Sequence, residues 1–201
     1  MDADIEAARP WVEEAAPTYL TLIDQQHLLS SLYNMVNVPQ AVWIDEDGRI
    51  VRPTEGGGSI DSLREFDVEA GAFKPDAMER AGQAKATYME AVKDWAKNGA
   101  ASQFAFSAEQ ARAHVSPVSD DAMLAHAKFQ LGQYLAAQGR AAEAEQLFAE
   151  CRALHPDSWN IFRQTTEKTD IGIAAGEEFW GKVMALGEKQ YYASVDMDGM
   201  P

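Results

Sequence analysis

The periodicity of apolar residues changes along the chain, and this change limits the folds that the chain can adopt. Over residues 1–55, short stretches with a helical period alternate with short strand-like runs, which is typical of an α/β fold. After about Pro75 the pattern is helical. Between them, Gly56-Gly57-Gly58 has the backbone freedom of a loop. The sequence therefore predicts an α/β segment followed by an all-α region.

These changes divide the chain into four predicted parts. Residues 1–58 form the α/β part, 59–74 a linker, 75–190 the helical region and 191–201 an irregular tail. A length of 201 residues fits one ordinary domain with a smaller appendage.

Charge and composition exclude several classes of partner. The net charge of -15, from 32 acidic and 17 basic side chains, repels phosphate, so we expect neither nucleic acid nor an anionic membrane surface as a partner. The acidic N-terminal residues do not resemble a secretory signal, and a single cysteine, Cys151, excludes an internal disulfide. We therefore predict a cytoplasmic protein. The four histidines have no metal-ligand spacing, and we expect no metal and no cofactor.

Residues 19–51 predict a strand, a helix and a β-hairpin in that order. Tyr19–Ile23 is a strand-like run, and Asp24 can cap the following helix. Pro39 precedes a second apolar run, and Asp45-Glu46-Asp47-Gly48 supplies turn residues before the next strand. The predicted helix carries its apolar residues on one face, at Leu28, Leu29, Leu32 and Tyr33.

In this order, residues 4–52 resemble the second half of the thioredoxin-like fold, as found in ResA-like thiol-disulfide reductases and AhpC/TSA peroxiredoxins. The resemblance implies that Pro39 is a cis-proline facing the redox-active cysteines. It also implies that the backbone of Val38 pairs with an extended substrate. Val38 and Pro39 are therefore the expected substrate-binding residues. Gln40 departs from the threonine common at its position, and a proline is also permitted simply as the first residue of a strand.

The chain lacks the Cys-x-x-Cys motif of that family, and we identify no catalytic residue. It resembles the C-terminal part of a thiol-disulfide, or selenol, oxidoreductase that has lost its catalytic motif. In the complete protein the substrate would be a protein or peptide disulfide, or a peroxide. Some ResA-like proteins have a Trp-Ala-x-x-Sec-Cys active site, whose selenocysteine codon is usually read as stop. We therefore expect a truncated selenoprotein, with loss of the catalytic half or misannotation of a cysteine form as alternatives.

Residues 125–156 resemble one tetratricopeptide repeat (TPR). Gly132 and Ala144 let two helices approach closely, and Phe148 fills the space between them. The matching positions are Leu131, Gly132, Leu135, Ala144, Phe148, Cys151 and Pro156. Cys151 would be a packed apolar thiol in this repeat. The alternative function is therefore a TPR-type module that binds a protein partner through the helical region. A fragment without a function is the third class that the sequence leaves open.

The remaining helices are predicted from their end signals. Pro75 and Gly99 delimit a long helix, Ser107 begins a capping box, and Ser119 caps a helix that extends to Gln138. We expect further helices ending near Leu154, following Pro156, and over residues 176–186. The five tryptophans are expected in the core or between helices, at Trp11, Trp43, Trp95, Trp159 and Trp180.

Overall fold

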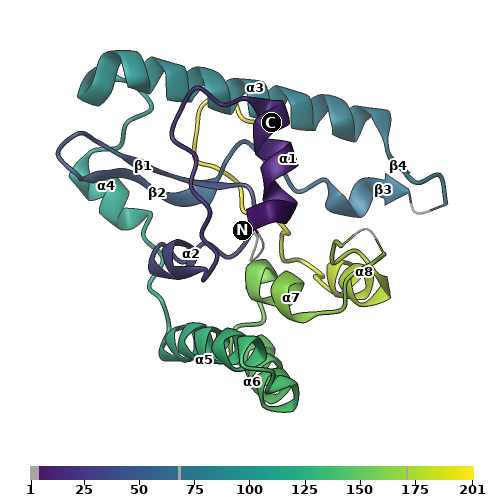
Figure 1. The fold of residues 1–201 in the computed structure, drawn as a ribbon. Helices are drawn as coiled ribbons and strands as arrows, with labels where there is room; N and C mark the ends of the chain where they lie inside the picture. The colour runs from purple at the N-terminus through teal and green to yellow at the C-terminus, as the bar shows by residue number, and fades with distance from the viewer. Residues whose placement is uncertain (1–4, 68, 171) are drawn as a thin grey trace. The chain divides into compact units, whose positions relative to one another are not determined.

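The structure is a computed structural model that describes residues 5–67, 69–170 and 172–201 (Figure 1). The chain divides into two compact units. The first unit holds the residues up to Val36 together with Val118–Thr165, and the second holds Asn37–Pro117 and Thr166–Pro201. Each unit combines chain from the α/β part with chain from the helical part. The layout along the sequence is thus mixed α/β and then helical, as predicted, whereas the units do not follow the predicted boundaries.

The first unit is helical in its described residues, and its centre is the α5–α6 hairpin. The two helices lie side by side (Figure 1), and Ser119 caps α5 by accepting a hydrogen bond from Ala122 N at 3.1 Å. Buried residues of α5, α6 and α7 form its core, namely Ala125, Phe129, Cys151 and Ile161. The helices of this unit are α1 (Ile5–Ala15), α2 (Leu28–Leu32), α5 (Asp120–Ala137), α6 (Ala141–Leu154) and α7 (Trp159–Thr165).

Close packing of α5 on α6 depends on Gly132, as the sequence predicted. A Cβ atom at Gly132 would lie 2.6 Å from Cε1 of the Phe148 ring, which is closer than real side chains approach. The ring therefore occupies the space that a side chain at Gly132 would need. Cys151 is fully buried in the same hairpin, and its thiol donates to Ala125 O at 3.2 Å.

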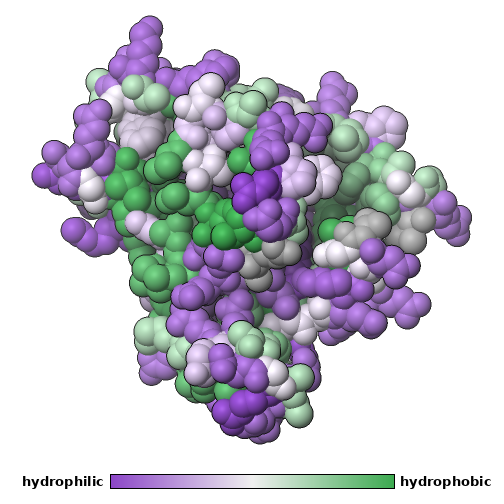
Figure 2. Space-filling view, in the orientation of Figure 1, coloured by the Kyte–Doolittle hydropathy of each residue, from purple (hydrophilic) through white to green (hydrophobic). Residues whose placement is uncertain are grey.

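The predicted strand at Tyr19–Ile23 is wrong for this structure, which has no strand there. Tyr19, Leu20 and Leu22 are 77%, 82% and 78% exposed. Figure 2 shows hydrophobic surface along the segment that precedes α2 and over α2 itself. A strand requires a hydrogen-bonding neighbour, and among the described residues no strand pairs with this segment. Asp24 nevertheless acts as predicted, since its carboxylate accepts from the amides of Leu28 and Ser30 at 2.9 and 3.1 Å.

The second unit is built on the predicted hairpin of β1 (Gln40–Ile44) and β2 (Ile50–Gly56), which pair antiparallel. Asp45 shapes the turn by accepting from the amides of Asp47 and Arg49 at 3.0 and 2.8 Å. Gly48 completes the turn with a φ of 79°, a conformation that favours glycine. Its other elements are η1 (Leu63–Glu65), β3 (Phe66–Asp67), β4 (Ala72–Phe73), α3 (Pro75–Asn98), η2 (Gly99–Ala101), α4 (Ala108–Ala113) and α8 (Glu177–Met184).

The hairpin packs on α3 and on the C-terminal tail, and the core of the unit lies between them. Trp43 of β1 contacts Tyr88 of α3, and Val195 and Met197 of the tail complete the cluster. The tail has no regular secondary structure, as predicted, but several of its side chains are buried. The buried side chains of Tyr191, Val195 and Met197 therefore tie this end of the chain to the core.

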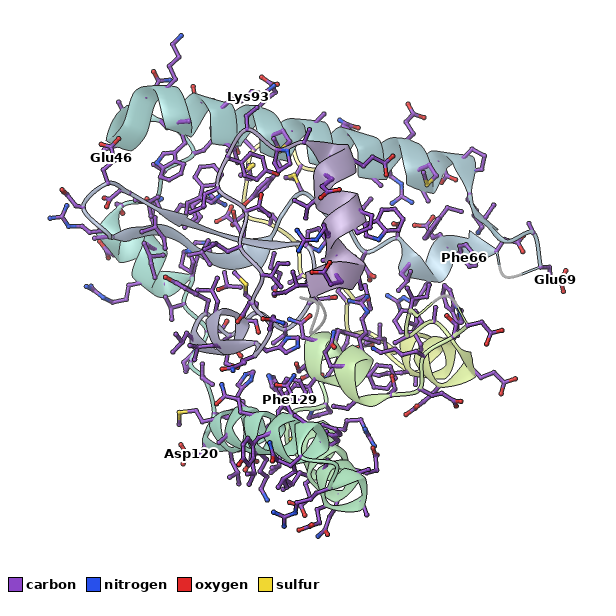
Figure 3. The ribbon with its side chains drawn as sticks, viewed as in Figure 1. Glu46, Phe66, Glu69, Lys93, Asp120 and Phe129 are labelled. Carbon is purple, nitrogen blue, oxygen red and sulfur yellow. The ribbon has the colours of Figure 1, made fainter. Side chains whose placement is uncertain are left out.

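The predicted linker is folded in the structure. A 3-10 turn and the small β3–β4 sheet occupy it, and Figure 3 labels Phe66 on β3. The Phe66 ring stacks on Trp180 of α8 with ring centroids 5.0 Å apart. Gly58 approaches α3 so closely that a Cβ there would lie 3.0 Å from Cβ of Tyr88. The glycine run therefore allows close packing as well as a turn.

One expectation about the tryptophans is corrected. Trp11 is 73% exposed instead of buried. Trp43 and Trp159 are buried as expected. None of the described helices combines the length and apolar character needed to cross a membrane.

Candidate functional site

The Val38–Pro39 dipeptide forms an exposed turn directly before β1. Its peptide bond is cis, as the resemblance implies. Asn37 is buried, and its Oδ1 accepts a 2.9 Å hydrogen bond from the Val38 amide. The Asn37 amide donates to Gln40 Oε1 at 3.0 Å, and the Gly57 amide donates to Pro39 O at 3.2 Å. The main chain is thus fixed on both sides of the dipeptide, while the two side chains remain exposed.

The C-terminal tail contributes two further contacts to this turn. Asn37 Nδ2 donates to Tyr191 O at 2.9 Å, and the hydroxyl of Tyr192 donates to Val38 O at 2.8 Å. Both backbone groups of Val38 are therefore hydrogen-bonded within the chain. An extended peptide that pairs with the Val38 carbonyl has to displace one exposed hydroxyl or share the carbonyl with it. Nothing in the sequence indicates Tyr192 as part of this site, because it lies 154 residues from Val38 in a tail without a recognisable motif.

Arg52 forms a buried ion pair within the hairpin and also binds the main chain of the tail. Arg52 of β2 is 1% exposed, and its guanidinium donates to both carboxylate oxygens of Glu55 at 2.8 and 2.9 Å. It also donates to Phe104 O at 2.8 Å and to Asp196 O at 2.7 Å. Its Cζ atom lies 4.0 Å from the ring centroid of Phe106, in a cation–π arrangement. Arg52 therefore holds the chain segment that carries Tyr192.

The same network extends into the core through an aromatic pair. Trp43 Nε1 donates to the hydroxyl of Tyr88 at 2.8 Å, and that hydroxyl donates to Glu55 Oε1 at 2.9 Å. Burial, followed by the charge of Glu55, raises the pKa of Tyr88 well above its ordinary value. Tyr88 therefore remains a neutral hydrogen-bond donor. The indole of Trp43, the hydroxyl of Tyr88 and the carboxylate of Glu55 each have a hydrogen-bond partner in this network.

A hollow of about 450 Å³ lies beside Tyr192. Two of the charged side chains that line it are paired, because Arg80 contacts Glu65 at 2.6 Å and Asp61 contacts Arg64 at 3.0 Å. The hollow contains no thiol among its lining residues. It adds a polar recess next to the exposed turn without adding a reactive group.

Cys151 does not supply the missing nucleophile. The thiol is buried in the first unit, and burial raises the pKa of Cys151 to about 11. At neutral pH such a cysteine is a protonated thiol, whereas disulfide exchange needs the thiolate. The prediction of a packed apolar thiol is in agreement with this position.

The structure brings together two of the four histidines, whose positions in the sequence show no metal-ligand spacing. The rings of His126 on α5 and His155 after α6 lie 5.5 Å apart, edge to face. Ser31 Oγ lies 3.2 Å from His126 Nδ1 and donates to His27 O at 2.8 Å, so it accepts from Nδ1–H. Burial, and then the charge of His155, lower the pKa of His126. No group of three or more metal-ligating side chains occurs in the described part of the chain.

This pair predicts a pH dependence of stability. The lowered pKa of His126 means that its contribution to the free energy of unfolding is complete above the ordinary value of 6.5 and is lost as the pH falls below it. We expect His126→Gln to lose less stability than the parent chain between pH 7.5 and 5, measured by urea unfolding. His114→Gln is the control, because the Gln110 carbonyl and then Asp196 raise the pKa of His114. Its change in the pH slope of stability should therefore have the opposite sign to that of His126→Gln. Equal slopes for parent and His126→Gln would contradict the assignment.

No protein-family model, curated protein or solved structure matches this chain. The functional assignment therefore depends on the residues and geometry described above.

Proposed function

We propose that this chain supplies the substrate-facing part of a thioredoxin-like thiol-disulfide or selenol oxidoreductase, and that it does not carry the redox-active group. The observation that supports this most directly is the exposed Val38–Pro39 turn, which Asn37 fixes from a buried position. A fixed main chain next to an exposed side chain can orient an extended peptide by backbone pairing. The only thiol of the chain, Cys151, is buried and protonated.

The exposed apolar residues that precede and form α2 support the same proposal. Tyr19, Leu20, Leu22 and Leu32 are each more than 70% exposed, and proteins seldom expose apolar side chains so fully in one continuous segment. Such a segment suits a domain whose remaining part covers it. In the complete protein the substrate is a protein or peptide disulfide, with a peroxide as the second option.

The reaction in the complete protein is thiol-disulfide exchange. A thiolate or selenolate attacks one sulfur of the substrate disulfide, a mixed disulfide or selenenyl sulfide forms, and the other substrate sulfur leaves as a thiolate that takes up a proton. A second thiol then releases the reduced substrate, and the enzyme pair is oxidised. In this reaction the residues of this chain bind the substrate peptide and orient it. Val38 O is the acceptor that becomes available to the peptide when the Tyr192 hydroxyl moves aside.

The purified 201-residue chain is expected to reduce neither insulin disulfides nor peroxide above the buffer rate, because it has no accessible thiolate. The DNA before the Met1 codon, read in frame with any internal stop decoded as selenocysteine or cysteine, should add roughly 60–120 residues, enough for an ordinary domain. The longer protein should be active, and equally so with Cys151→Ser. Turnover by the 201-residue chain that Cys151→Ser abolishes would overturn the proposal, as would an upstream region without any such motif.

A second candidate function is a TPR-type protein-binding module formed by the helical region. The close Gly132–Phe148 packing and the exposed apolar residues of α5 favour it. If the longer protein has no disulfide reductase or peroxidase activity, we expect the TPR-type binding function instead.

A further inference from the structure

Three of the four histidines gather in the first unit, where α2 contacts α5 and the end of α6. The rings of His126 and His155 lie 5.5 Å apart. His27, directly before α2, is buried, and its ring lies 5.3 Å from the ring of Phe129 on α5. We call these three residues the histidine interface. Histidine is the side chain that ordinarily changes its charge between pH 5 and 8, so mild acid changes the charge of this interface.

The neutral form of His126 is the one that fits the closed interface. Ser31 Oγ of α2 accepts from Nδ1–H of His126, so the other ring nitrogen, Nε2, is an acceptor in the neutral imidazole. Nε2 is buried, and no described residue forms a hydrogen bond with it. A proton on Nε2 would therefore place an N–H donor and a positive charge where no acceptor lies, beside the ring of His155.

The charged groups around the histidine interface do not compensate for this charge. Burial, and then the positive charge of His155, lower the pKa of His126, and no carboxylate among the described residues raises it. Lys128 and Glu150 pair with each other, and Asp24 accepts from amides of α2. The charged side chains near the three histidines in the sequence, together with that of α7, are Asp24, Lys128, Glu150, Arg152, Asp157 and Arg163.

Helix α2 is the element that can leave this interface most easily. It has only five residues, and its three leucines, Leu28, Leu29 and Leu32, are 53%, 50% and 72% exposed. Little apolar surface therefore holds α2 in place, and its contacts through Ser31 and His27 carry much of its attachment. The α5–α6 hairpin, by contrast, has a buried core of its own. Segments with few buried apolar contacts open first.

The chain that follows α2 is held by contacts without a titratable group. Asn160 of α7 donates its amide to Val36 O at 3.0 Å, and its side chain donates to Met35 O. Because these contacts do not depend on pH between 5 and 8, Met35 and Val36 stay attached when the histidine interface changes its charge.

We propose that the histidine interface is an acid-sensitive latch, which holds α2 on α5 at neutral pH and releases it in mild acid. Release exposes His126 and His155 to water, where both rings can carry a charge. The opening is local and precedes unfolding of the α5–α6 hairpin. The inference does not rest on the proposed redox function, because every contact of the latch lies within the first unit.

Hydrogen exchange of the whole chain, followed by NMR and corrected for the intrinsic rate at each pH, tests the latch. A five-residue helix is not stable without its packing, so its amides report the release. The protection of the Ser31, Tyr33 and Met35 amides should fall about tenfold from pH 7.5 to 5.0, because each proton taken up on opening lowers protection by up to tenfold per pH unit. The amides of α5 should keep theirs. Unchanged protection of α2 would overturn the proposal, as would equal losses in α2 and α5, which indicate global unfolding.

Histidine variants assign the effect to the latch. His126→Gln keeps a polar side chain beside Ser31 but cannot become charged, so the fall in α2 protection should shrink to about threefold or less. His155→Gln removes the neighbouring charge and should reduce the fall as well. His114→Gln, in the second unit, is the matched control and should show the fall of the parent chain. If both His126→Gln and His155→Gln fall as the parent does, the latch assignment is wrong. Where a variant does not fold, the comparison of α2 with α5 in the parent decides.

Discussion

Replacing Arg52 by alanine is expected to lower the free energy of unfolding by about 3–5 kcal/mol, because the change leaves a largely buried carboxylate without its partner. The Glu55 carboxylate would retain only the Tyr88 hydroxyl as a donor from this network. The carbonyls of Phe104 and Asp196 would each lose a charged donor. Urea unfolding followed by circular dichroism measures the change.

Arg49 is the matched control for Arg52, since it lies on the same hairpin and also pairs with an acidic residue, Asp47. Both side chains of that pair are exposed, and an exposed pair contributes about 0–1 kcal/mol. Arg49→Ala should therefore change the stability little. Similar losses for the two variants would show that the buried network does not stabilise the hairpin as the contacts imply. We also expect Arg52→Ala to loosen the tail, visible as faster amide exchange at Tyr191 and Tyr192.

Replacing Gly132 by valine is expected to destabilise the α5–α6 hairpin by about 2–3 kcal/mol through overpacking. The added Cβ alone would lie 2.6 Å from Cε1 of Phe148, and the two methyl groups make the conflict worse. Thermal unfolding followed by circular dichroism measures the loss. Gly82→Val is the control within a helix, because nothing lies within 4 Å of a Cβ at Gly82. That variant should be nearly neutral.

A double variant distinguishes the clash from a general intolerance of valine at this position. Phe148→Ala removes the ring that conflicts with Gly132→Val, so the two losses should combine to less than their sum by about 1 kcal/mol or more. Strict additivity would mean that the Phe148 ring moves aside in Gly132→Val and that the glycine is not required for the helix approach.

Turn residues and helix-capping residues in the sequence determined where the hairpin turn and two of the helices begin. The Asp45–Gly48 turn fixed the hairpin, because its residues favour the conformations that the turn needs. Ser107 and Ser119 located the starts of α4 and α5 by satisfying free amides. The repeat-like spacing also predicted the Gly132–Phe148 contact, since it reflects packing between neighbouring helices.

Tertiary structure alone decided what lies around the candidate site. Nothing near Val38 in sequence indicates that Tyr192 bonds its carbonyl, or that Arg52 ties β2 to Asp196, because these contacts join residues 154 and 144 positions apart. The apolar pattern at Tyr19–Ile23 indicated burial in a sheet, but a strand forms only where a neighbour supplies hydrogen bonds. The pattern of apolar and polar residues in the sequence therefore determined which residues need a partner. Only the tertiary structure decided which partners they have.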